Sequence, residues 1–403
     1  MALRPDRTIV TIAEARAILD ASGSPIARTE TVSLHHLSGR VLACDLDATM
    51  DVPPFARAAM DGYAVIAADT AGAREDTPVT LTLGDSVYTG DAPGHHLAPG
   101  SCTGIATGAP LPDGADAVVM IEQTTRDGDL VRIRNAARAG QNIGRRGSDV
   151  RAGQRVLTEG TLLTPGRLGV IAALGLPQAT VYARPRVAIL CTGNEVVEPG
   201  VPLGPGQIYD VNTGTLAAVV REHGGDPVAY APVADDRAAI ARAFEMALVA
   251  DMVLVAGGSS VGERDYILET IEARGTVRFQ GIAIKPGKPT IFGIADDTPV
   301  FGMPGNPTSC LSNAYLLVAP LLRTIARLPP RVDDGIRARL TQRVSSPASR
   351  HQFYPVRLEG GDAVPAFKGS GDITSLAEAD GYFEIAADVE RVDEGTIVKV
   401  RRF

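Results

Sequence analysis

Residues 186–195, RVAILCTGNE, hold the pattern that decides the expected fold. Their apolar run, Val187–Cys191, is typical of a buried strand, and a polar loop that contains a glycine follows it directly. The same order recurs at Met252–Ala256 before GGSSVGERD, at Gly281–Lys285 before PGKP, and at Val300–Gly302 before MPGNP. Polar loops that follow buried strands indicate an α/β domain whose chemistry lies at the carboxyl ends of the strands.

Helices are expected between these strands, and Val228–Pro232 adds one further strand. Apolar residues recur at helical spacing in four segments, which are Thr215–His223, Arg237–Val249, Tyr266–Arg274 and Thr308–Arg327. Either Asp235 or Asp236 is the expected N-cap of the second helix. Strands that alternate with helices predict parallel strands in a doubly wound sheet.

The segments outside this α/β region show other sequence patterns. Ile12–Ala21 shows helical spacing, with Thr11 as N-cap and Glu14 in the capping-box position. Residues 51–149 are rich in Gly, Pro and Thr with brief apolar alternations, which favours a β-rich domain with long loops. Pro165–Gly175 predicts a short helix, and residues 336–403 predict a small β domain. The expected fold class is therefore a multidomain protein of α/β and β domains.

Composition excludes several classes of protein. The net charge of -8 among 403 residues argues against a nucleic-acid binder, and tryptophan is absent. The four cysteines form no C-x-x-C pair, which is typical of reduced thiols in the cytoplasm. No apolar run approaches the roughly 20 residues of a membrane span, and no signal peptide is evident. We therefore expect a cytoplasmic protein that binds neither nucleic acid nor membrane.

The loops at the strand ends share one chemistry. Glycines and serines at Gly257, Gly258, Ser259 and Ser260 let the backbone approach a phosphate, and Lys285 and Lys288 neutralise an oxyanion. Glu195 and Asp265 are candidate ligands for Mg²⁺. Taken singly, each loop is also explained as a turn, Asp265 as a helix-capping residue, and the prolines of MPGNP as the start of a helix. Their occurrence together predicts a reaction at a phosphoanhydride.

A second set of motifs lies in the β-rich domain, at residues 51–65, 106–118 and 141–149. Each alone is explained as a turn of a small β domain. Arg145 and Arg146, followed by Asp149, are consistent with an anion contact or a subunit contact, and their spacing does not decide between these.

Ordered motifs over most of the chain resemble the molybdopterin molybdenumtransferase family, MoeA, and the E domain of gephyrin. The matching stretches run from residue 51 to residue 309, and they are DVPPFARAAMDGYAV, TGAPLPDGADAVV, GQNIGRRGSDV, TGNE, GQIYDVN, GGSSVGERDY, IKPGKP and GMPGNPTS. A weaker match, GSGDITSLAEADGY at 369–382, extends the resemblance into the C-terminal domain.

The resemblance implies a homodimer of four-domain subunits. These would be an α/β molybdopterin-binding domain (1–27 and 183–328), an elongated linking and dimerisation domain (28–46 and 150–182), a β-rich domain that completes the partner's cleft (47–149), and a C-terminal β domain (329–403). The implied substrates are adenylylated molybdopterin and molybdate, the products are molybdenum cofactor and AMP, and Mg²⁺ assists. Other implied partners are the molybdopterin adenylyltransferase and the molybdoenzymes that receive the product.

The resemblance also assigns roles to individual residues. Glu195 and Asp265 would act at the metal and the adenylyl phosphate, and Lys285 and Lys288 would bind the oxyanion. Catalytic roles would extend to Asp61 of the β-rich domain and to Asp235 or Asp236. The remaining expected binding residues are Gly257, Gly258, Ser259, Ser260, Pro304, Asn306, Pro307, Thr107, Asp149, Arg350, Ser370 and Ser375.

Some positions depart from the family pattern. Gly281 and Gly144 stand where many members have a basic residue, and Ser148 stands where an acidic residue is common. An alternative function is that of the sister enzyme that adenylylates molybdopterin, and another is a non-catalytic scaffold like gephyrin. The extra domains, together with the presence of Glu195 and Asp265, favour insertion. The sequence does not distinguish molybdate from tungstate.

Overall fold

A computed structural model describes residues 9–92, 96–257, 263–332 and 334–403, and for residues 263–265 it describes the backbone alone. The chain divides into two compact units. The first comprises the residues up to Glu30, Gly39–Val41 and Val181–Phe403, and the second comprises Thr31–Ser38 and Leu42–Thr180. The finer division into four domains stays a prediction. Among the described residues, no helix is both long and apolar enough to cross a membrane.

The first unit is built on a six-stranded sheet. Its order is β16 (Asp226–Ala229), β13 (Arg186–Thr192), β17 (Met252–Gly257), β21 (Thr298–Met303), β20 (Ile291–Ala295) and β18 (Gly275–Gln280). The first four strands are parallel, whereas β20 is antiparallel to both β21 and β18. The central strands β13, β17 and β21 are buried almost throughout, as near-continuous apolar runs predict for strands covered on both faces.

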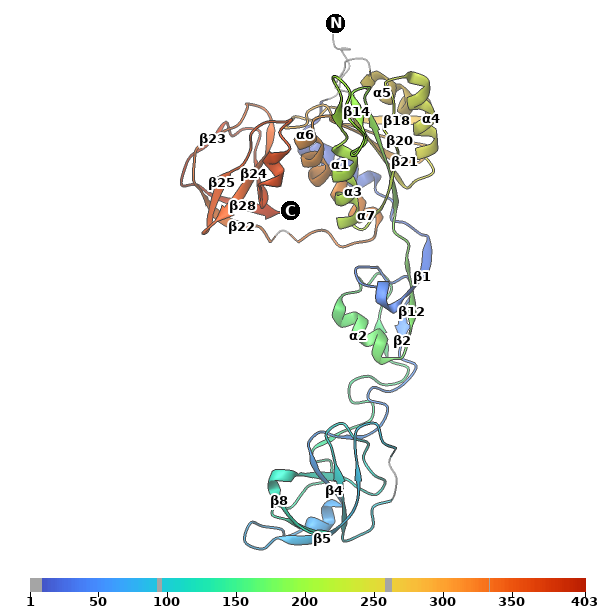
Figure 1. Ribbon diagram of the computed structural model, residues 1–403, viewed down its shortest axis with the longest axis vertical. Helices are drawn as coiled ribbons and strands as arrows, with labels where there is room; N and C mark the ends of the chain where they lie inside the picture. The colour runs from blue at the N-terminus through green and yellow to red at the C-terminus, as the bar shows by residue number, and fades with distance from the viewer. Residues whose placement is uncertain (1–8, 93–95, 258–262, 333) are drawn as a thin grey trace. The chain divides into compact units, whose positions relative to one another are not determined.

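Helices cover both faces of this sheet (Figure 1). One layer contains α1 (Ile12–Ser22), α3 (Asn212–Glu222), α6 (Pro307–Asn313), the π-helical turn η4 (Ala314–Val318) and α7 (Ala319–Ile325), and the other contains α4 (Arg237–Ala247) and α5 (Glu263–Arg274). Val187 and Ile189 of β13 belong to the first hydrophobic cluster, and Ala188 and Leu190 belong to the second. Alternate residues therefore face opposite layers, which confirms the doubly wound arrangement. The predicted capping box of α1 is present.

Three of the expected elements differ from the prediction. Gly281–Lys285 is not a strand of this sheet, because β20 pairs with β21 at that position and β18 forms the edge beyond β20. Only Ile284–Lys285 is a strand (β19), and it pairs with the C-terminal domain. The strand expected at Val228–Pro232 begins two residues earlier, as β16. The expected helix over Thr308–Arg327 is interrupted by η4, because Pro320 donates no backbone hydrogen bond to the preceding turn.

The C-terminal domain is a closed β-structure in the first unit. Its sheet runs β19, β24 (His351–Glu359), β25 (Asp362–Pro365), β22 (Ile336–Leu340), β28 (Ile397–Arg402) and β26 (Gly381–Ile385), and β26 also pairs with β24. β23 (Val344–Ser345) pairs with β27 (Arg391–Val392), and α8 spans Thr374–Ala377. The pairing of β26 with both β24 and β28 closes the structure around one hydrophobic cluster.

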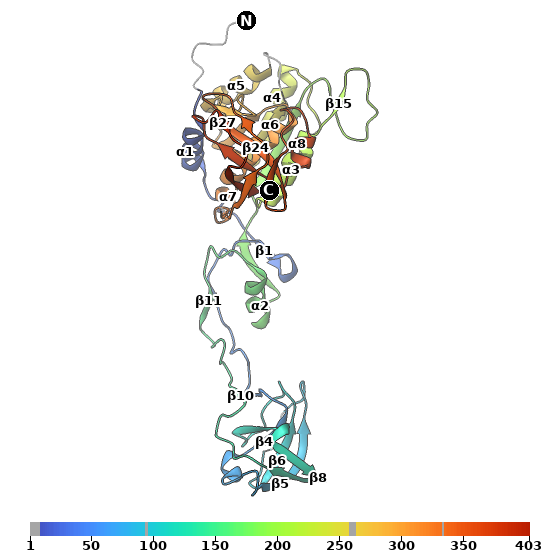
Figure 2. The ribbon, with the colours of Figure 1, turned by 90° about the vertical axis from the view of Figure 1, so that its left-hand side faces the viewer.

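The second unit contains the predicted β-rich domain (Figure 2). Its sheet runs β7 (Ala117–Met120), β4 (Gly62–Val65), β6 (Ser101–Ile105), β5 (Val79–Val87), β9 (Leu130–Ile133) and β8 (Thr124–Asp127). Beyond it lie the helix α2 (Pro165–Ala173) and the pairs of β2 (Leu46–Asp47) with β11 (Arg155–Leu157) and β3 (Arg57–Ala58) with β10 (Ile143–Gly144). β1 (Thr29–Ser33) pairs with β12 (Gln178–Tyr182), and the boundary between the units falls within both strands.

Candidate active site

A strongly basic cavity of about 470 Å³ lies where three loops of the first unit meet. The loops follow β19, β21 and β25, and Arg350, directly before β24, also lines the cavity. Six of the expected binding residues meet there: Lys285, Lys288, Pro304, Asn306, Arg350 and Ser370. Lys368 also lines the cavity, and all four charged side chains among the described lining residues are cations. Cations without a carboxylate in the lining favour an anionic ligand that carries several charges.

A buried side chain fixes the turn between Lys285 and Lys288. The Asn313 side-chain amide donates to the Gly287 carbonyl at 2.9 Å, and the Thr290 hydroxyl donates to the same oxygen at 3.0 Å. Gly287 has φ +102°, and a Cβ there would lie 2.3 Å from the Asn313 amide nitrogen. Only glycine fits this position, because a side chain would be strained and would also collide with the group that holds the turn.

Lys368 was missed by the sequence analysis. Its Nζ donates to Glu378 at 2.7 Å and to the Thr374 hydroxyl at 2.9 Å, so its side chain is held at the edge of the cavity. Ser375, expected to contact an anion, is completely buried, and its hydroxyl instead accepts a bond of 2.9 Å from the Lys368 backbone N–H. The signal was present in the sequence, because Lys368 directly precedes the GSGD motif.

The other loops of the cavity are also connected. The Asn306 amide donates to the Ser370 hydroxyl at 3.2 Å, and the Thr308 hydroxyl donates to the Asp372 carbonyl at 2.8 Å. These bonds join the MPGNP loop to the GSGD loop. Pro307 lies in the first turn of α6. Backbone N–H groups in a first turn have no partner within the helix, so a proline there removes no helical hydrogen bond.

The carboxyl end of β13 presents oxygen atoms. Glu195 is exposed in the loop after this strand. Asp235 and Asn194 bond reciprocally, each side-chain oxygen accepting from the other's backbone N–H at 3.1 Å, whereas Asp236 caps α4. Among the described residues, the Thr192 hydroxyl and the Asp235 Oδ1 are buried with no hydrogen-bond partner. Buried oxygens without partners are positioned to bind a cation or a donor.

Gly257 lies at the end of β17, where the backbone is crowded. A Cβ there would be 2.3 Å from the Thr192 carbonyl oxygen, so glycine allows the ends of β13 and β17 to approach. Gly258, Ser259 and Ser260 lie outside the described residues, and so does the Asp265 side chain. Among the side chains that the structure does describe, no three of His, Cys, Asp and Glu gather as a metal site.

The candidate residues of the second unit, Asp61, Thr107 and Asp149, lie on three of its motifs. The Asp61 Oδ1 accepts a hydrogen bond of 2.7 Å from the Thr107 backbone N–H. This bond, together with a hydrogen bond to the Thr107 side chain, holds the pKa of Asp61 below its usual value. Asp149 is exposed, and its backbone N–H donates to the Val52 carbonyl at 3.0 Å. Arg146, in the same motif, donates to Asp51 at 2.6 Å, so this side chain has an intramolecular role.

Three family models match successive parts of the chain. They are described as the MoeA N-terminal region (domain I and II), over residues 10–175, the probable molybdopterin binding domain, over residues 188–324, and the MoeA C-terminal region (domain IV), over residues 337–403. A relative from Mycobacterium tuberculosis, named molybdopterin molybdenumtransferase 2, is 38% identical over 93% of this chain and 95% of its own. A molybdopterin molybdenumtransferase from Haemophilus influenzae is 33% identical over 93% of this chain and 94% of its own.

Solved structures agree with these matches. A molybdopterin biosynthesis MoeA protein from Pyrococcus horikosii superposes with a TM-score of 0.84 and 40% identity, and the alignment covers 98% of each chain. The models and the relatives span nearly the whole chain, so that both compact units are included. The chain therefore belongs to the MoeA family of molybdopterin molybdenumtransferases.

Proposed function

We propose that the protein inserts molybdate into adenylylated molybdopterin, forming molybdenum cofactor and releasing AMP. The observation that carries this proposal is the basic cavity, in which Lys285, Lys288 and Arg350 meet and no carboxylate is found among the described lining residues. Adenylylated molybdopterin carries a phosphoanhydride, and molybdate is a dianion, so both substrates need such cations. The names of full-length relatives support molybdate insertion over adenylylation or a scaffold role.

The cations of the cavity act by position and charge. Because the turn around Gly287 is anchored by Asn313, Lys285 and Lys288 are held in place before the substrate binds. Preorganised cations stabilise charge that develops on the phosphate oxygens as the phosphoanhydride breaks, without reorganising during the reaction. Asn306 and Ser370, bonded to each other, place neutral donors beside them.

The oxygens at the end of β13 fit the implied Mg²⁺. Thr192 and Asp235 each have a buried oxygen with no partner among the described residues, and Mg²⁺ takes oxygen ligands in proteins. These residues, with Glu195 and Asp265, would hold the ion, which when bound withdraws charge from the adenylyl phosphate. Asp235 orients the TGNE loop through Asn194, and Asp236 instead stabilises the start of α4.

We also propose that the active protein is a homodimer and that Asp61, Thr107 and Asp149 complete the cleft of the second subunit. The family resemblance supports this arrangement. The Asp61 carboxylate, fixed by the Thr107 amide, would then face the substrate from the opposite side.

The test is release of AMP in a single turnover of adenylylated molybdopterin by the full chain, with and without molybdate and Mg²⁺. We expect release to depend on both and to fall by about a hundredfold or more in Glu195→Gln, as for removal of one electrostatic contact. The matched control is Glu198→Gln, an exposed carboxylate that follows the short strand Val196–Val197, which should keep wild-type activity. Equal activity of Glu195→Gln and the wild type would contradict the proposal. So would AMP release at the same rate with and without molybdate.

A further inference from the structure

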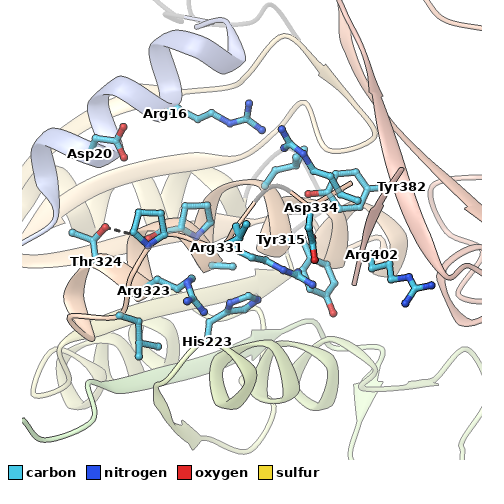
Figure 3. Close-up of a pocket in the computed structure, with 17 residues that line it drawn as sticks. Arg16, Asp20, His223, Tyr315, Arg323, Thr324, Arg331, Asp334, Tyr382 and Arg402 are labelled. Atoms are coloured by element: carbon cyan, nitrogen blue, oxygen red, sulfur yellow. Dashed lines mark hydrogen bonds between the residues drawn. The ribbon is translucent and has the colours of Figure 1, made fainter. Parts of the chain in front are cut away.

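A second cavity, of about 340 Å³, lies in the first unit between α1, α7 and the strands β26 and β28 of the C-terminal domain (Figure 3). It shares no lining residue with the basic cavity of the proposed active site. Its volume lies within the range of small-molecule sites. Nothing in the proposed reaction uses it, and its lining has two chemically different parts.

One part of the lining is apolar and aromatic. It includes the rings of Tyr315 and Tyr382 and the side chains of Leu316 and Leu328. The Tyr382 ring is stacked on Phe353 with centroids 4.1 Å apart, and the Tyr315 ring packs on Phe403 at 5.0 Å. Rings held in this way offer a fixed surface for a flat apolar group.

The other part is cationic. The Arg323 guanidinium donates to the Pro329 carbonyl at 2.9 Å and 2.6 Å, which fixes its position, and Arg331 lies beside it. Burial, together with the charge of Arg331, lowers the pKa of Arg323, so the two guanidinium groups are close enough to repel each other. Glu222 lies 4.0 Å from Arg331, and the cavity is lined by two carboxylates, Asp20 and Asp334, against five arginines, so its charged lining is cationic on balance. An oxyanion between the two groups would relieve this repulsion.

A buried histidine faces the same cavity (Figure 3). His223 is 3% exposed, and among the described residues neither ring nitrogen has a hydrogen-bond partner. The closest carboxylate oxygen, on Glu222, is 3.7 Å from Nε2, which is longer than a hydrogen bond. Buried polar groups are almost always paired, so an unpaired imidazole in the wall of a cavity indicates a ligand that pairs with it.

We propose that this cavity binds a small organic anion, with its carboxylate or phosphate on Arg323 and Arg331, its flat apolar body against Tyr315 and Tyr382, and a polar atom bonded to His223. Guanidinium groups bind carboxylate and phosphate by the same paired hydrogen bonds, so the shared chemistry is an oxyanion. The ligand would connect α7 to the C-terminal domain, because the cavity is lined by both.

The test is isothermal titration calorimetry on the full chain with 3-phenylpropionate, phenyl phosphate and the neutral 3-phenylpropanamide. We expect at least one of the two anions to bind and the amide not to bind. In Arg331→Gln the Kd for that anion should rise by about tenfold or more, as for loss of a charge-assisted hydrogen bond. Arg331 is suitable because its side chain is 43% exposed and its only ion pair among the described residues is long.

Two controls separate this site from others. Arg343→Gln removes an exposed arginine of the same unit outside the cavity, and Lys288→Gln removes a cation of the basic cavity. Both variants should keep the wild-type Kd. At a ligand concentration near the wild-type Kd, the chemical shifts of the His223 ring nitrogens should change clearly in the wild type and much less in Arg331→Gln. Absence of binding by both anions, equal binding of the amide, or loss of binding in Lys288→Gln with retention in Arg331→Gln would overturn the proposal.

Discussion

The carboxylate of Asp61 accepts a hydrogen bond of 2.7 Å from the backbone N–H of Thr107. This bond joins two motifs of the β-rich domain that are distant in sequence, and it orients the carboxylate at the surface of that domain. In the proposed dimer, Asp61 acts in the cleft of the other subunit, where Lys288 belongs to the basic cavity.

This arrangement predicts complementation between two defective subunits. Asp61→Asn and Lys288→Gln should each lose most of the AMP release. Subunit exchange in an equal mixture makes half of the dimers mixed, and each mixed dimer has one site with both wild-type residues. We expect the mixture to recover about a quarter of the wild-type activity. A mixture no more active than the single variants would show that both residues act within one chain.

The Gly287 turn predicts a large local effect. Gly287→Ala places a Cβ against the Asn313 amide at a position with φ +102°, so the turn that holds Lys285 and Lys288 must shift. We expect a loss of about 2 kcal/mol or more in the free energy of unfolding, and also weaker substrate binding. The control is Gly371→Ala, where a Cβ meets no atom within 4 Å and φ is not positive. Equal stability of the two variants in urea unfolding would refute this explanation of the turn.

Much of this architecture was predictable because it depends on local sequence. The apolar runs of β13, β17 and β21 and the polar loops after them follow from patterns a few residues long, and so does the capping box at Thr11. Long-range pairing was not predictable. Gly281–Lys285 has the composition of a strand, but β19 pairs with β24, and no local pattern specifies that partner.

The site, like the fold, was predictable from the sequence only where it depends on local patterns. Lys285, Lys288, Pro304 and Asn306 were found because each follows an apolar run in the expected α/β domain. Lys368 comes from a different domain, and only the pairing of that domain with β19 brings it to the cavity. Asp235 and Asp236 were indistinguishable in the sequence, because either could cap α4. Tertiary contacts separated them.

The ionised carboxylate of Glu384 is expected to make the stability of the fold sensitive to acid. Burial raises the pKa of its carboxyl, but the hydrogen bond with His351 and the charges of Arg16 and Arg401 outweigh burial and hold it at about 2. Because this pKa is below the ordinary 4.5, the stability that Glu384 contributes is fully present above pH 4.5 and is lost as the pH falls towards 2. Glu384→Gln should lower the free energy of unfolding at pH 7 by about 3 kcal/mol. The exposed Glu390→Gln should change it by less than about 0.5 kcal/mol. Similar urea midpoints for the two variants would count against this network.

A second pH dependence is expected from His223, where gain of a proton by the ring, rather than by a carboxylate, should destabilise the fold. Burial, with the charges of Arg323 and Arg331, lowers the pKa of its ring from 6.5 to about 4, so the ring is neutral in the folded protein at pH 7. The unfolded chain binds this proton more readily, so the free energy of unfolding should fall as the pH drops from 6.5 to 4. His223→Gln should flatten the pH dependence in this window, whereas the exposed His35→Gln should not. An unchanged slope in His223→Gln would contradict this shift, because it would mean that the ring binds its proton equally well in the folded and unfolded states.

The central claim is that release of AMP and insertion of the metal are one reaction in the basic cavity. The most direct measurement is a single turnover in which AMP released and molybdenum bound to the pterin are both quantified over time. We predict equal amounts formed at the same rate in the wild type, and a parallel decrease of both in Lys285→Gln and Lys288→Gln. Release of AMP without bound molybdenum, or bound molybdenum in the absence of AMP release, would contradict the claim.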